Sequence, residues 1–321
     1  MRPIVAKVTG QTGSATSIAA STTLGAAGNI PQGGTLATAV GIAAAQTSTG
    51  TTPLLLNGSK AFSGTVLLAT PTRLNLQSTG NLSAINFTIV GEVAQGPDTT
   101  GNTSGPQTEV IAGPNNNIVT TLNTFIRVLS ITPSASVGTN VVVYGTAILA
   151  NATEVALASA SDNSAVTFKV SGFNANGQPI TESITGPGAG LTVNTVNYFS
   201  AVTQIAASAA TTAVTVGNSA SASTPWVVLD YLQTNFNVGL SVELAAGDST
   251  NYSVEITNDD VFGGIPYVTP TPVAFFVPVM ALVGQNINGV GSLTVPCRAV
   301  RVITNSGTGV VTLGVTQGMT V

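Results

Sequence analysis

The chain has 321 residues and a net charge of −4, and only 6% of its residues are charged. Its eight basic residues are scattered along the chain, so it carries too little local positive charge to bind nucleic acid electrostatically. The sequence contains no histidine, which excludes Ser-His-Asp and Cys-His catalysis and removes the commonest metal ligand.

Low charge is the main signal in the composition. A free cytosolic enzyme usually has a surface on which about a quarter of the residues are charged. This chain is instead rich in Ala, Thr, Ser, Gly, Val and Asn, and its frequent β-branched alternation argues against disorder. The composition is typical of a surface that neighbouring subunits cover in an assembly.

Residues 3–8 form an expected strand at the start of the chain. No apolar run of the length of a signal peptide follows Arg2. The most apolar run, residues 273–283, is too short to span a bilayer and contains Pro278. We therefore expect a soluble protein that is made in the cytoplasm and has no membrane partner.

Residues 11–52 are mostly Ala, Gly, Ser and Thr, with no sustained hydrophobic period. We predict an extended arm with little core of its own, which becomes ordered mainly through contacts with other chains. A weakly patterned pair of β-hairpins is the alternative. The alanine content of residues 35–46 also allows a helix there.

The clearest element is a β-hairpin at residues 165–187. Apolar and polar residues alternate around Phe168, as in a strand with one buried face. Asn176-Gly177 is a strong turn signal, because both residues tolerate positive φ. The return strand then carries Glu182 between two isoleucines on one face.

The same pattern occurs earlier in the chain. Phe87 matches Phe168 at an offset of 168 − 87 = 81 residues, whereas Glu109 matches Glu182 at 182 − 109 = 73. The first copy therefore has a longer turn, within residues 93–108, and its Gly, Pro, Asn, Asp and Thr content predicts a protruding loop. We expect the two copies to share one fold, with Phe87 on Phe168 and Glu109 on Glu182.

These patterns predict an all-β protein: tandem small β-sandwich or barrel repeats followed by a jelly-roll-like or Ig-like β-sandwich, with an extended N-terminal arm. The expected domains are residues 1–52 for the N-terminal strand and arm, 53–145 for the first repeat, 146–221 for the second and 222–321 for the C-terminal sandwich. The junction near residues 144–147 is short, so the two repeats should have little relative freedom.

The C-terminal sandwich begins at Trp226. Strands are expected at residues 227–231, 238–244, 251–257, 299–304 and 310–315. The last two should form a closing hairpin around the Asn-Ser-Gly-Thr-Gly sequence that starts at Asn305.

Few side chains suggest chemistry. Cys297 is the only cysteine, which excludes a disulfide within the chain, and we interpret it as a buried small apolar residue. Trp226 is assigned to core packing. Glu109 and Glu182 are interpreted as solvated or hydrogen-bonded strand carboxylates, because no cluster of possible ligands accompanies them.

Acidic residues gather near one loop of the C-terminal sandwich. Asp259 and Asp260, with Glu255 and Asp248 upstream, could bind Ca²⁺, but their spacing matches no calcium-loop motif and favours a capped turn. A glycosidase needs two carboxylates across a cleft, usually with aromatic residues for the sugar, and aromatic residues are sparse here. We predict no enzymatic activity, no catalytic residue, no cofactor and no metal.

Several segments resemble a domain that is common in structural proteins of tailed bacteriophages. The resemblance rests on Trp226-Val-Val-Leu-Asp230, residues 236–240, Tyr252-Ser253-Val254-Glu255 before residues 257–260, residues 298–301, the Gly-rich end at 307–318, and Gly177-Gln-Pro-Ile-Thr-Glu-Ser-Ile-Thr-Gly-Pro187 in the repeat. It covers about residues 53–321. Proteins of this kind include capsid decoration (cement) proteins and head or neck appendages, which are often trimeric, and the family implies no catalytic residues.

The resemblance implies a non-enzymatic virion protein, first of all a capsid decoration protein that stabilises the outer head shell. Its expected partners are the major capsid protein or other virion proteins and further copies of itself in a homotrimer, without nucleic acid. A tail, neck or fibre component is the alternative. A carbohydrate-binding tail protein is a third possibility, which the sparse aromatic residues disfavour.

The N-terminal strand is the candidate assembly contact. It comprises Arg2, Pro3, Ile4, Val5, Ala6, Lys7 and Val8. In phage domains of the resembled type, such a strand usually stands directly before the Trp226-like segment, whereas here more than 200 residues separate the two. One hypothesis is that the arm and both repeats are an insertion and that this strand pairs with the C-terminal sandwich of its own chain. The other is that it docks on a neighbouring subunit.

Overall fold

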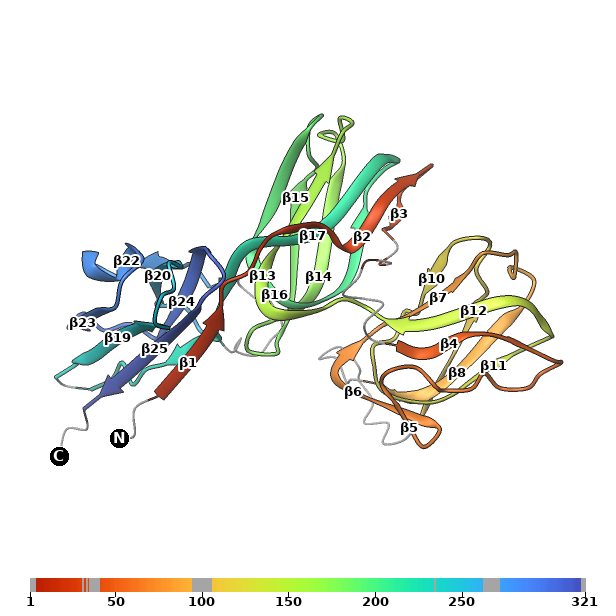
Figure 1. Cartoon of the computed structure of the whole chain (residues 1–321), viewed down its shortest axis with the longest axis horizontal. Coiled ribbons are helices and arrows are strands. Elements are labelled where there is room, and N and C mark those ends of the chain that lie inside the picture. Colours follow the sequence, from red (N-terminus) through yellow and green to blue (C-terminus); the bar gives the residue numbers. More distant parts are fainter. Residues whose placement is uncertain are drawn as a thin grey trace.

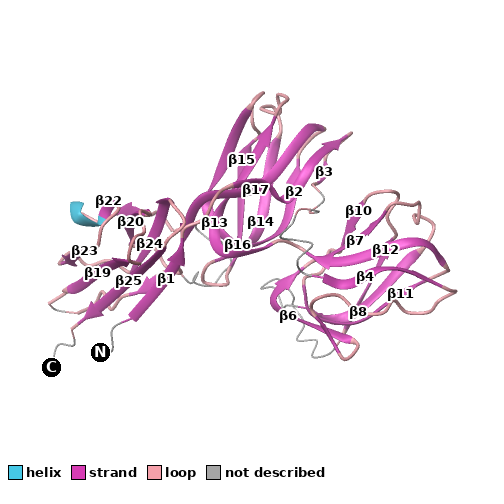
Figure 2. Cartoon of the chain, in the orientation of Figure 1, coloured by secondary structure: helices cyan, strands magenta, loops and turns pink. Residues whose placement is uncertain are grey.

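The computed structural model describes residues 4–30, 32, 34, 41–93, 106–233, 235–261 and 272–318. The all-β prediction is confirmed, because the described residues form antiparallel sheets with one short 3-10 helix, η1 (Met280–Leu282) (Figure 2). Within these ranges no sheet closes into a barrel. Of the two predicted architectures, the sandwich is therefore the one observed.

Three β-sandwich units lie in a row, and both chain ends belong to the same outer one (Figure 1). We call this the terminal unit, the next the middle unit and the last the distal unit. Each has its own hydrophobic core.

The terminal unit joins the N-terminal strand to the C-terminal part of the chain. Its elements are β1 (Ile4–Thr9), β18 (Val227–Val228), β19 (Val238–Leu244), β20 (Asn251–Thr257), β21 (Phe275–Phe276), η1, β22 (Val283–Gln285), β23 (Gly289–Leu293), β24 (Ala299–Ser306) and β25 (Val310–Gln317). One sheet has the order β1-β25-β19-β23, with Ile4 opposite Val315 and Thr9 opposite Val310. The hypothesis that the N-terminal strand pairs with the sandwich of its own chain is confirmed.

The predicted closing hairpin is wrong. β25 pairs with β19 and β1 in one sheet, whereas β24 pairs with β20, β18 and β17 in the other. Each strand turns its apolar residues toward the same core from opposite sides, so the connection has to cross between the sheets. Thr250 and Asp248 hold this connection by accepting hydrogen bonds from the N–H groups of Gly309 and Val310. The strand expected at residues 227–231 is also shorter, because β18 ends at Val228.

The middle unit is likewise built from two separate parts of the chain. Its strands are β2 (Ser14–Leu24), β3 (Gly28–Asn29), β13 (Ile148–Ser159), β14 (Thr167–Asn174), β15 (Pro179–Thr185), β16 (Leu191–Ala207) and β17 (Thr211–Ser223). β2 pairs with β17, and β3 pairs with β16. β17 also pairs with β24 through Ala222 and Ser223, which makes one sheet continuous from the middle unit into the terminal unit.

The distal unit is continuous in sequence. Its strands are β4 (Gly41–Ser48), β5 (Ala61–Phe62), β6 (Thr65–Thr72), β7 (Leu74–Ser78), β8 (Asn86–Val93), β9 (Gln107–Ala112), β10 (Ile118–Thr120), β11 (Phe125–Pro133) and β12 (Val137–Gly145). Two sheets, β5-β6-β11-β8-β9 and β10-β7-β12-β4, enclose its core. The distal unit is thus inserted in the middle unit, which is itself inserted in the terminal unit.

The prediction of an arm at residues 11–52 that has little core of its own is wrong. Ile18 and Ile30 lie in the core of the middle unit, and Ile42 lies in that of the distal unit. The partner strands β17 and β12 lie far along the chain, and each Ile-Ala-Ala run is too short to show a period. The helix allowed at residues 35–46 is wrong for the part that lies in β4, and residues 35–40 lie outside the described residues.

The segment from β2 to residue 58 contains a short repeat that was not predicted from the sequence. Gly34 donates its N–H to the carbonyl of Ile18 at 2.9 Å, and Gly58 donates to Ile42 at 3.0 Å, at a common offset of 42 − 18 = 24 residues. The N–H groups of Ile30 and Leu54, which share that offset, donate to β16 and β11, respectively. Each repeat therefore has its own N-terminal strand.

The predicted repeat itself is confirmed by matched strand pairing. β8 pairs with β9 and β11, as β14 pairs with β15 and β16. Phe87 and Phe168 are both fully buried at matching core positions. The loop predicted to protrude within residues 93–108 falls largely on residues 94–105, which lie outside the described residues.

The two matched glutamates bind the backbone in the same way. Glu109 accepts hydrogen bonds from the N–H groups of Leu122 and Asn123 at 2.6 and 2.9 Å. Glu182 accepts from Val196 and Asn197 at 2.8 and 2.9 Å. Glu109 therefore holds the link between β10 and β11, and Glu182 holds the equivalent segment, which lies within β16. These contacts confirm the hydrogen-bonded alternative.

Replacing Glu109 or Glu182 with alanine should lower the free energy of unfolding by about 1–3 kcal/mol, because two backbone N–H groups lose their acceptors. Urea denaturation of the full chain measures the change. Glu243→Ala is the matched control, since Glu243 is exposed on β19 and its removal should change stability by less than about 0.5 kcal/mol. Equal midpoints for all three variants would contradict this role.

Candidate functional site

A large cavity lies where the middle and terminal units meet. It has a volume of about 640 Å³. Side chains from β13, the β14–β15 hairpin and β16 line one side, and side chains from β20 and β24 line the other. Its principal polar and aromatic lining residues are Glu154, Asn174, Asn176, Tyr198, Trp226, Glu255 and Arg301.

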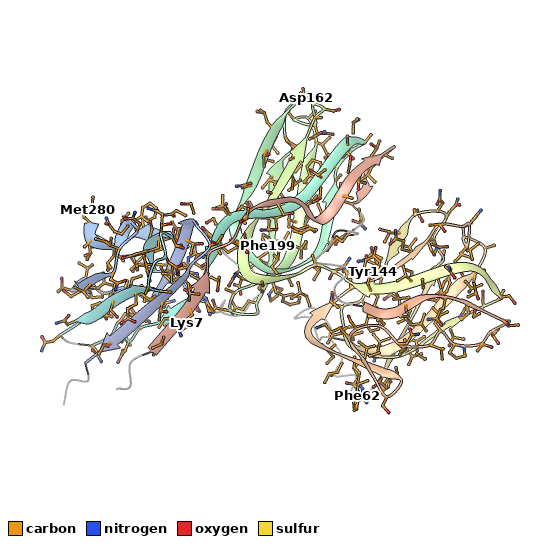
Figure 3. The ribbon with its side chains drawn as sticks, viewed as in Figure 1. Lys7, Phe62, Tyr144, Asp162, Phe199 and Met280 are labelled. Carbon is orange, nitrogen blue, oxygen red and sulfur yellow. The ribbon has the colours of Figure 1, made fainter. Side chains whose placement is uncertain are left out.

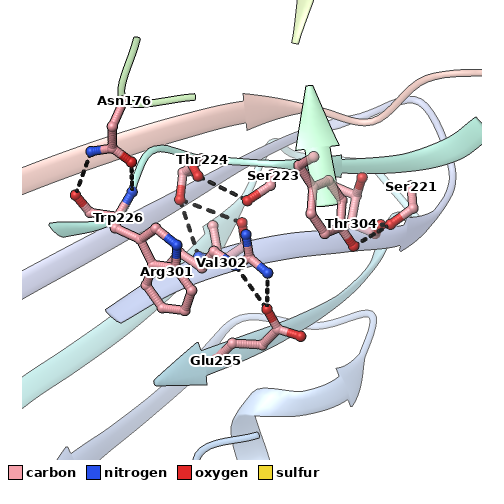
Figure 4. A network of polar contacts seen from close by, with 10 residues as sticks. Asn176, Ser221, Ser223, Thr224, Trp226, Glu255, Arg301, Val302 and Thr304 are labelled. Atoms are coloured by element: carbon pink, nitrogen blue, oxygen red, sulfur yellow. Dashed lines mark hydrogen bonds and ion pairs between the residues drawn. The ribbon is translucent and has the colours of Figure 1, made fainter. Parts of the chain in front are cut away.

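Arg301 is the central side chain of this junction. Arg301 on β24 lies opposite Glu255 on β20. Its Nε donates a hydrogen bond to Oε2 of Glu255 at 2.8 Å, and a terminal guanidinium nitrogen lies 2.7 Å from the same oxygen (Figure 4). The two side chains are only 13% and 12% exposed. The guanidinium carbon also lies 4.4 Å from the ring centre of Trp226 and 4.7 Å from that of Tyr198. These cation–π contacts connect Arg301 to both units.

The tip of the β14–β15 hairpin forms hydrogen bonds with the backbone of the terminal unit. The side-chain amide of Asn176 accepts a hydrogen bond from the N–H of Trp226 at 3.0 Å and donates one to its carbonyl at 3.3 Å (Figure 4). Asn174 Oδ1 accepts from the N–H groups of Asn176 and Gln178, which fixes the tip in this orientation. The turn signal of the sequence thus also marks a contact between units.

Hydroxyl groups continue the junction along β17 and β24. The Tyr198 hydroxyl lies 2.8 Å from that of Ser221, which donates to the carbonyl of Thr304 at 2.9 Å. Burial raises the pKa of Tyr198 to about 12, so its phenol stays protonated at neutral pH. Thr224 Oγ1 accepts from the N–H of Val302. These hydroxyl groups form hydrogen bonds with one another and with the backbone. The arrangement therefore connects the middle and terminal units and leaves no reactive group among these described residues aimed at a substrate.

Glu154 lies at the edge of the same cavity. Asn194 donates a hydrogen bond to its Oε2 at 3.2 Å. Burial raises the pKa of the Glu154 carboxyl above its ordinary value of 4.5, and hydrogen bonds from Ser219 and Asn194 oppose that change. The net effect is that the folded protein penalises the ionised form of this side chain.

The predictions that Trp226 and Cys297 pack in the core are both confirmed. Trp226 packs against Val261 and Ala299, and Cys297 is buried in the core of the terminal unit. Burial raises the pKa of the Cys297 thiol to about 11, which leaves almost no thiolate for nucleophilic attack. The contact of Trp226 with Arg301 was missed. Its only signal was a cation between Val300 and Val302 in an otherwise apolar strand.

The acidic residues of the C-terminal sandwich do not converge. Glu255 pairs with Arg301, Asp248 caps the N–H of Val310, and Asp259 accepts from the N–H of Val273 at 2.7 Å. Across the part of the chain that the structure describes, no three His, Cys, Asp or Glu side chains form a metal-binding group. The geometry of Asp248 and Asp259 is that of carboxylates that cap backbone N–H groups.

The candidate assembly contact lies at the edge of a sheet. Arg2 and Pro3 lie outside the described residues, and the other five candidates belong to β1. Among the described strands, β1 stands at the edge of the terminal sheet and pairs only with β25, and Ile4 and Val5 are exposed. Its role in assembly stays a prediction.

Comparisons of the chain with protein-family models, curated proteins and solved structures found no match. Among the described residues, no helix has the length and apolar character needed to cross a membrane.

Arg301→Ala should lower the free energy of unfolding by about 3 kcal/mol, because it leaves the buried Glu255 carboxylate unpaired and removes both ring contacts. Arg301→Lys should restore part of this loss, since it keeps the charge without the planar group. Arg127→Ala is the matched control: its pair with Glu92 is 42% and 39% exposed, so the change should stay below about 1 kcal/mol. Chemical denaturation checks the order, and equal losses for Arg301→Ala and Arg127→Ala would contradict it.

Glu154→Gln should stabilise the protein at neutral pH and have less effect in acid. Because the folded-state pKa of Glu154 is raised, its ionisation removes stability as the pH rises from 4.5 through the raised pKa. Glutamine keeps an acceptor for Asn194 and has no ionised form. The difference in unfolding midpoint between variant and wild type should therefore shrink well below pH 4.5. A difference that grows in acid would contradict the assigned direction.

Proposed function

We propose that the protein is a non-enzymatic structural component of a tailed-bacteriophage virion, and specifically a capsid decoration protein that binds and stabilises the outer head shell. The observation that carries the proposal is the nested architecture. The chain passes twice through each junction between units, and the middle–terminal junction also has a continuous sheet and the Arg301 contacts. Such a molecule suits a stiff bridge between subunits.

The surface chemistry supports the same function. A chain with 6% charged residues presents mostly small polar and apolar groups, which bind through buried area and backbone pairing when neighbours cover them. The proposed partners are the major capsid protein and other copies of this chain in a homotrimer. The exposed edge of β1 is the proposed contact in the terminal unit.

A tail, neck or fibre component is the second candidate, because a stiff row of β-units serves there equally well. A carbohydrate-binding tail protein has less support. Sugars usually stack on exposed aromatic rings that line a cleft. The two rings in the cavity between the middle and terminal units, Trp226 and Tyr198, are instead buried and in contact with the Arg301 guanidinium.

Electron microscopy and quantitative mass spectrometry of purified virions test the proposal. We expect the chain on the outer face of the head, at a copy number comparable to that of the major capsid protein. Location at the neck or tail in few copies would replace decoration by the second candidate. Absence from virions, or reproducible hydrolysis by the purified chain that one point mutation abolishes, would overturn the structural function.

A further inference from the structure

The outward face of the sheet β5-β6-β11-β8-β9 in the distal unit exposes several apolar side chains. Phe62, Leu67 and Val110 are 84%, 73% and 58% exposed. Phe62 lies opposite Thr65, two residues before Leu67 on the same strand, so the two large side chains are diagonal neighbours on one face. Figure 3 shows Phe62 at the outer margin of the distal unit. This unit lies at the opposite end of the molecule from the chain termini (Figure 1).

A pair of opposite charges lies beside these residues on the same face. Arg127 on β11 is opposite Leu67 on β6 and opposite Glu92 on β8. The Arg127 and Glu92 side chains approach to 3.3 Å and stay about two-fifths exposed, at 42% and 39%. We call the group formed by Phe62, Leu67, Val90, Val110 and Leu129, with Arg127 and Glu92, the distal face.

The middle unit provides an internal comparison, because it has the same strands. At the repeat offsets of 81 and 73, Ser171 and Ser183 stand where the distal face has Val90 and Val110. After the glutamates the offset is 74, and Thr203 stands where the distal face has Leu129. In the middle unit these positions are polar: Thr203 Oγ1 donates to the carbonyl of Ser171 at 3.1 Å, and Thr181 Oγ1 donates to Ser171 Oγ at 3.1 Å.

Positions that face the core do not show this change. Ile89 and Val128 of the distal unit match Val170 and Val202 of the middle unit, and all four are fully buried. The fold therefore requires apolar residues on the inner face and tolerates hydroxyl groups on the outer one. At the three compared positions, Val90, Val110 and Leu129, the apolar character of the distal face therefore has a cause other than folding.

We propose that the distal face is the contact through which copies of this chain bind one another. Phe62, Leu67 and Val110 are exposed, Val90 and Leu129 are half-buried, and the Arg127–Glu92 pair lies among them. Exposed apolar side chains grouped with charged ones are typical of a protein interface. The distal face carries one cation and one anion in adjacent positions, so a second copy supplies both complementary charges. The proposal rests on the self-association proposed above and is independent of the place of the protein in the virion. Because the distal face meets the same face of the second copy, this contact is twofold and joins two chains, so it is separate from the threefold contact of the proposed homotrimer.

Sedimentation of the full-length chain across a concentration series tests the apolar part. The double variant Phe62→Ser/Leu67→Ser should raise the concentration for half-dissociation by about tenfold or more. At a concentration at which both wild type and variant are dissociated, it should leave the unfolding midpoint nearly unchanged, because both side chains are largely exposed in the single chain. Val290→Ser is the matched control: Val290 is 75% exposed on β23 of the terminal unit, and its replacement should not change association.

A mixing experiment tests the charged part. Arg127→Glu and Glu92→Arg should each weaken association, because each variant places like charges on facing copies. An equimolar mixture of the two should associate again, since unlike copies then meet with opposite charges. A purely structural role for the pair within one chain would give no recovery on mixing.

The distal face would be overturned as the contact if the wild-type chain stayed monomeric at all concentrations. It would also be overturned if the Phe62→Ser/Leu67→Ser variant associated like wild type, or if mixing Arg127→Glu with Glu92→Arg gave no recovery of association. A chain that associates as expected but is absent from virions would instead refute the proposed function and leave the contact intact.

Discussion

The pairing of β1 with β25 is the constraint on which the rest of the structure depends. It places the first and last strands of the chain side by side in one sheet, so everything between must leave the terminal unit and return to it. The middle unit repeats this arrangement, because β2 pairs with β17 around the complete distal unit. Insertions of this kind are tolerated where the ends of the inserted segment lie close together. The nested order therefore follows from two strand pairings.

Because the units are nested, neighbouring units must be held together at each junction. Polar and aromatic side chains form many of these contacts. Between the middle and terminal units, a guanidinium with five donors in a rigid plane can pair with Glu255 and still contact two aromatic rings. Asn176 adds two hydrogen bonds to the backbone of Trp226. Between the middle and distal units, Tyr144 packs against the core of the middle unit, and Ile148 packs against that of the distal unit. Each unit thus completes part of its neighbour.

Several features could be predicted because their causes are local in sequence. Alternation around Phe168 and the Asn176-Gly177 signal defined the hairpin, and comparison with Phe87 defined the repeat. The matched Glu109 and Glu182 were recognised as a pair, but their acceptor role depends on backbone N–H groups that lie more than ten residues further along the chain. The cavity could not be predicted, since its lining residues come from strands whose contacts no local pattern specifies.

The sequence by itself determined the all-β class, the two related repeats, the core positions of Trp226 and Cys297, and the absence of histidine-based chemistry, because composition and period-2 alternation act within a few residues. Only the tertiary structure decided that residues 14–30 belong to the middle unit, that β24 and β25 lie in different sheets, and that Arg301 joins two units. These features depend on hydrogen bonds between strands far apart in the chain. Although β2 is 11 residues long, most of them are Ser, Thr and Ala, so it contains too few large apolar residues to specify its partner. The unpaired edge of the partner strand supplies that information instead.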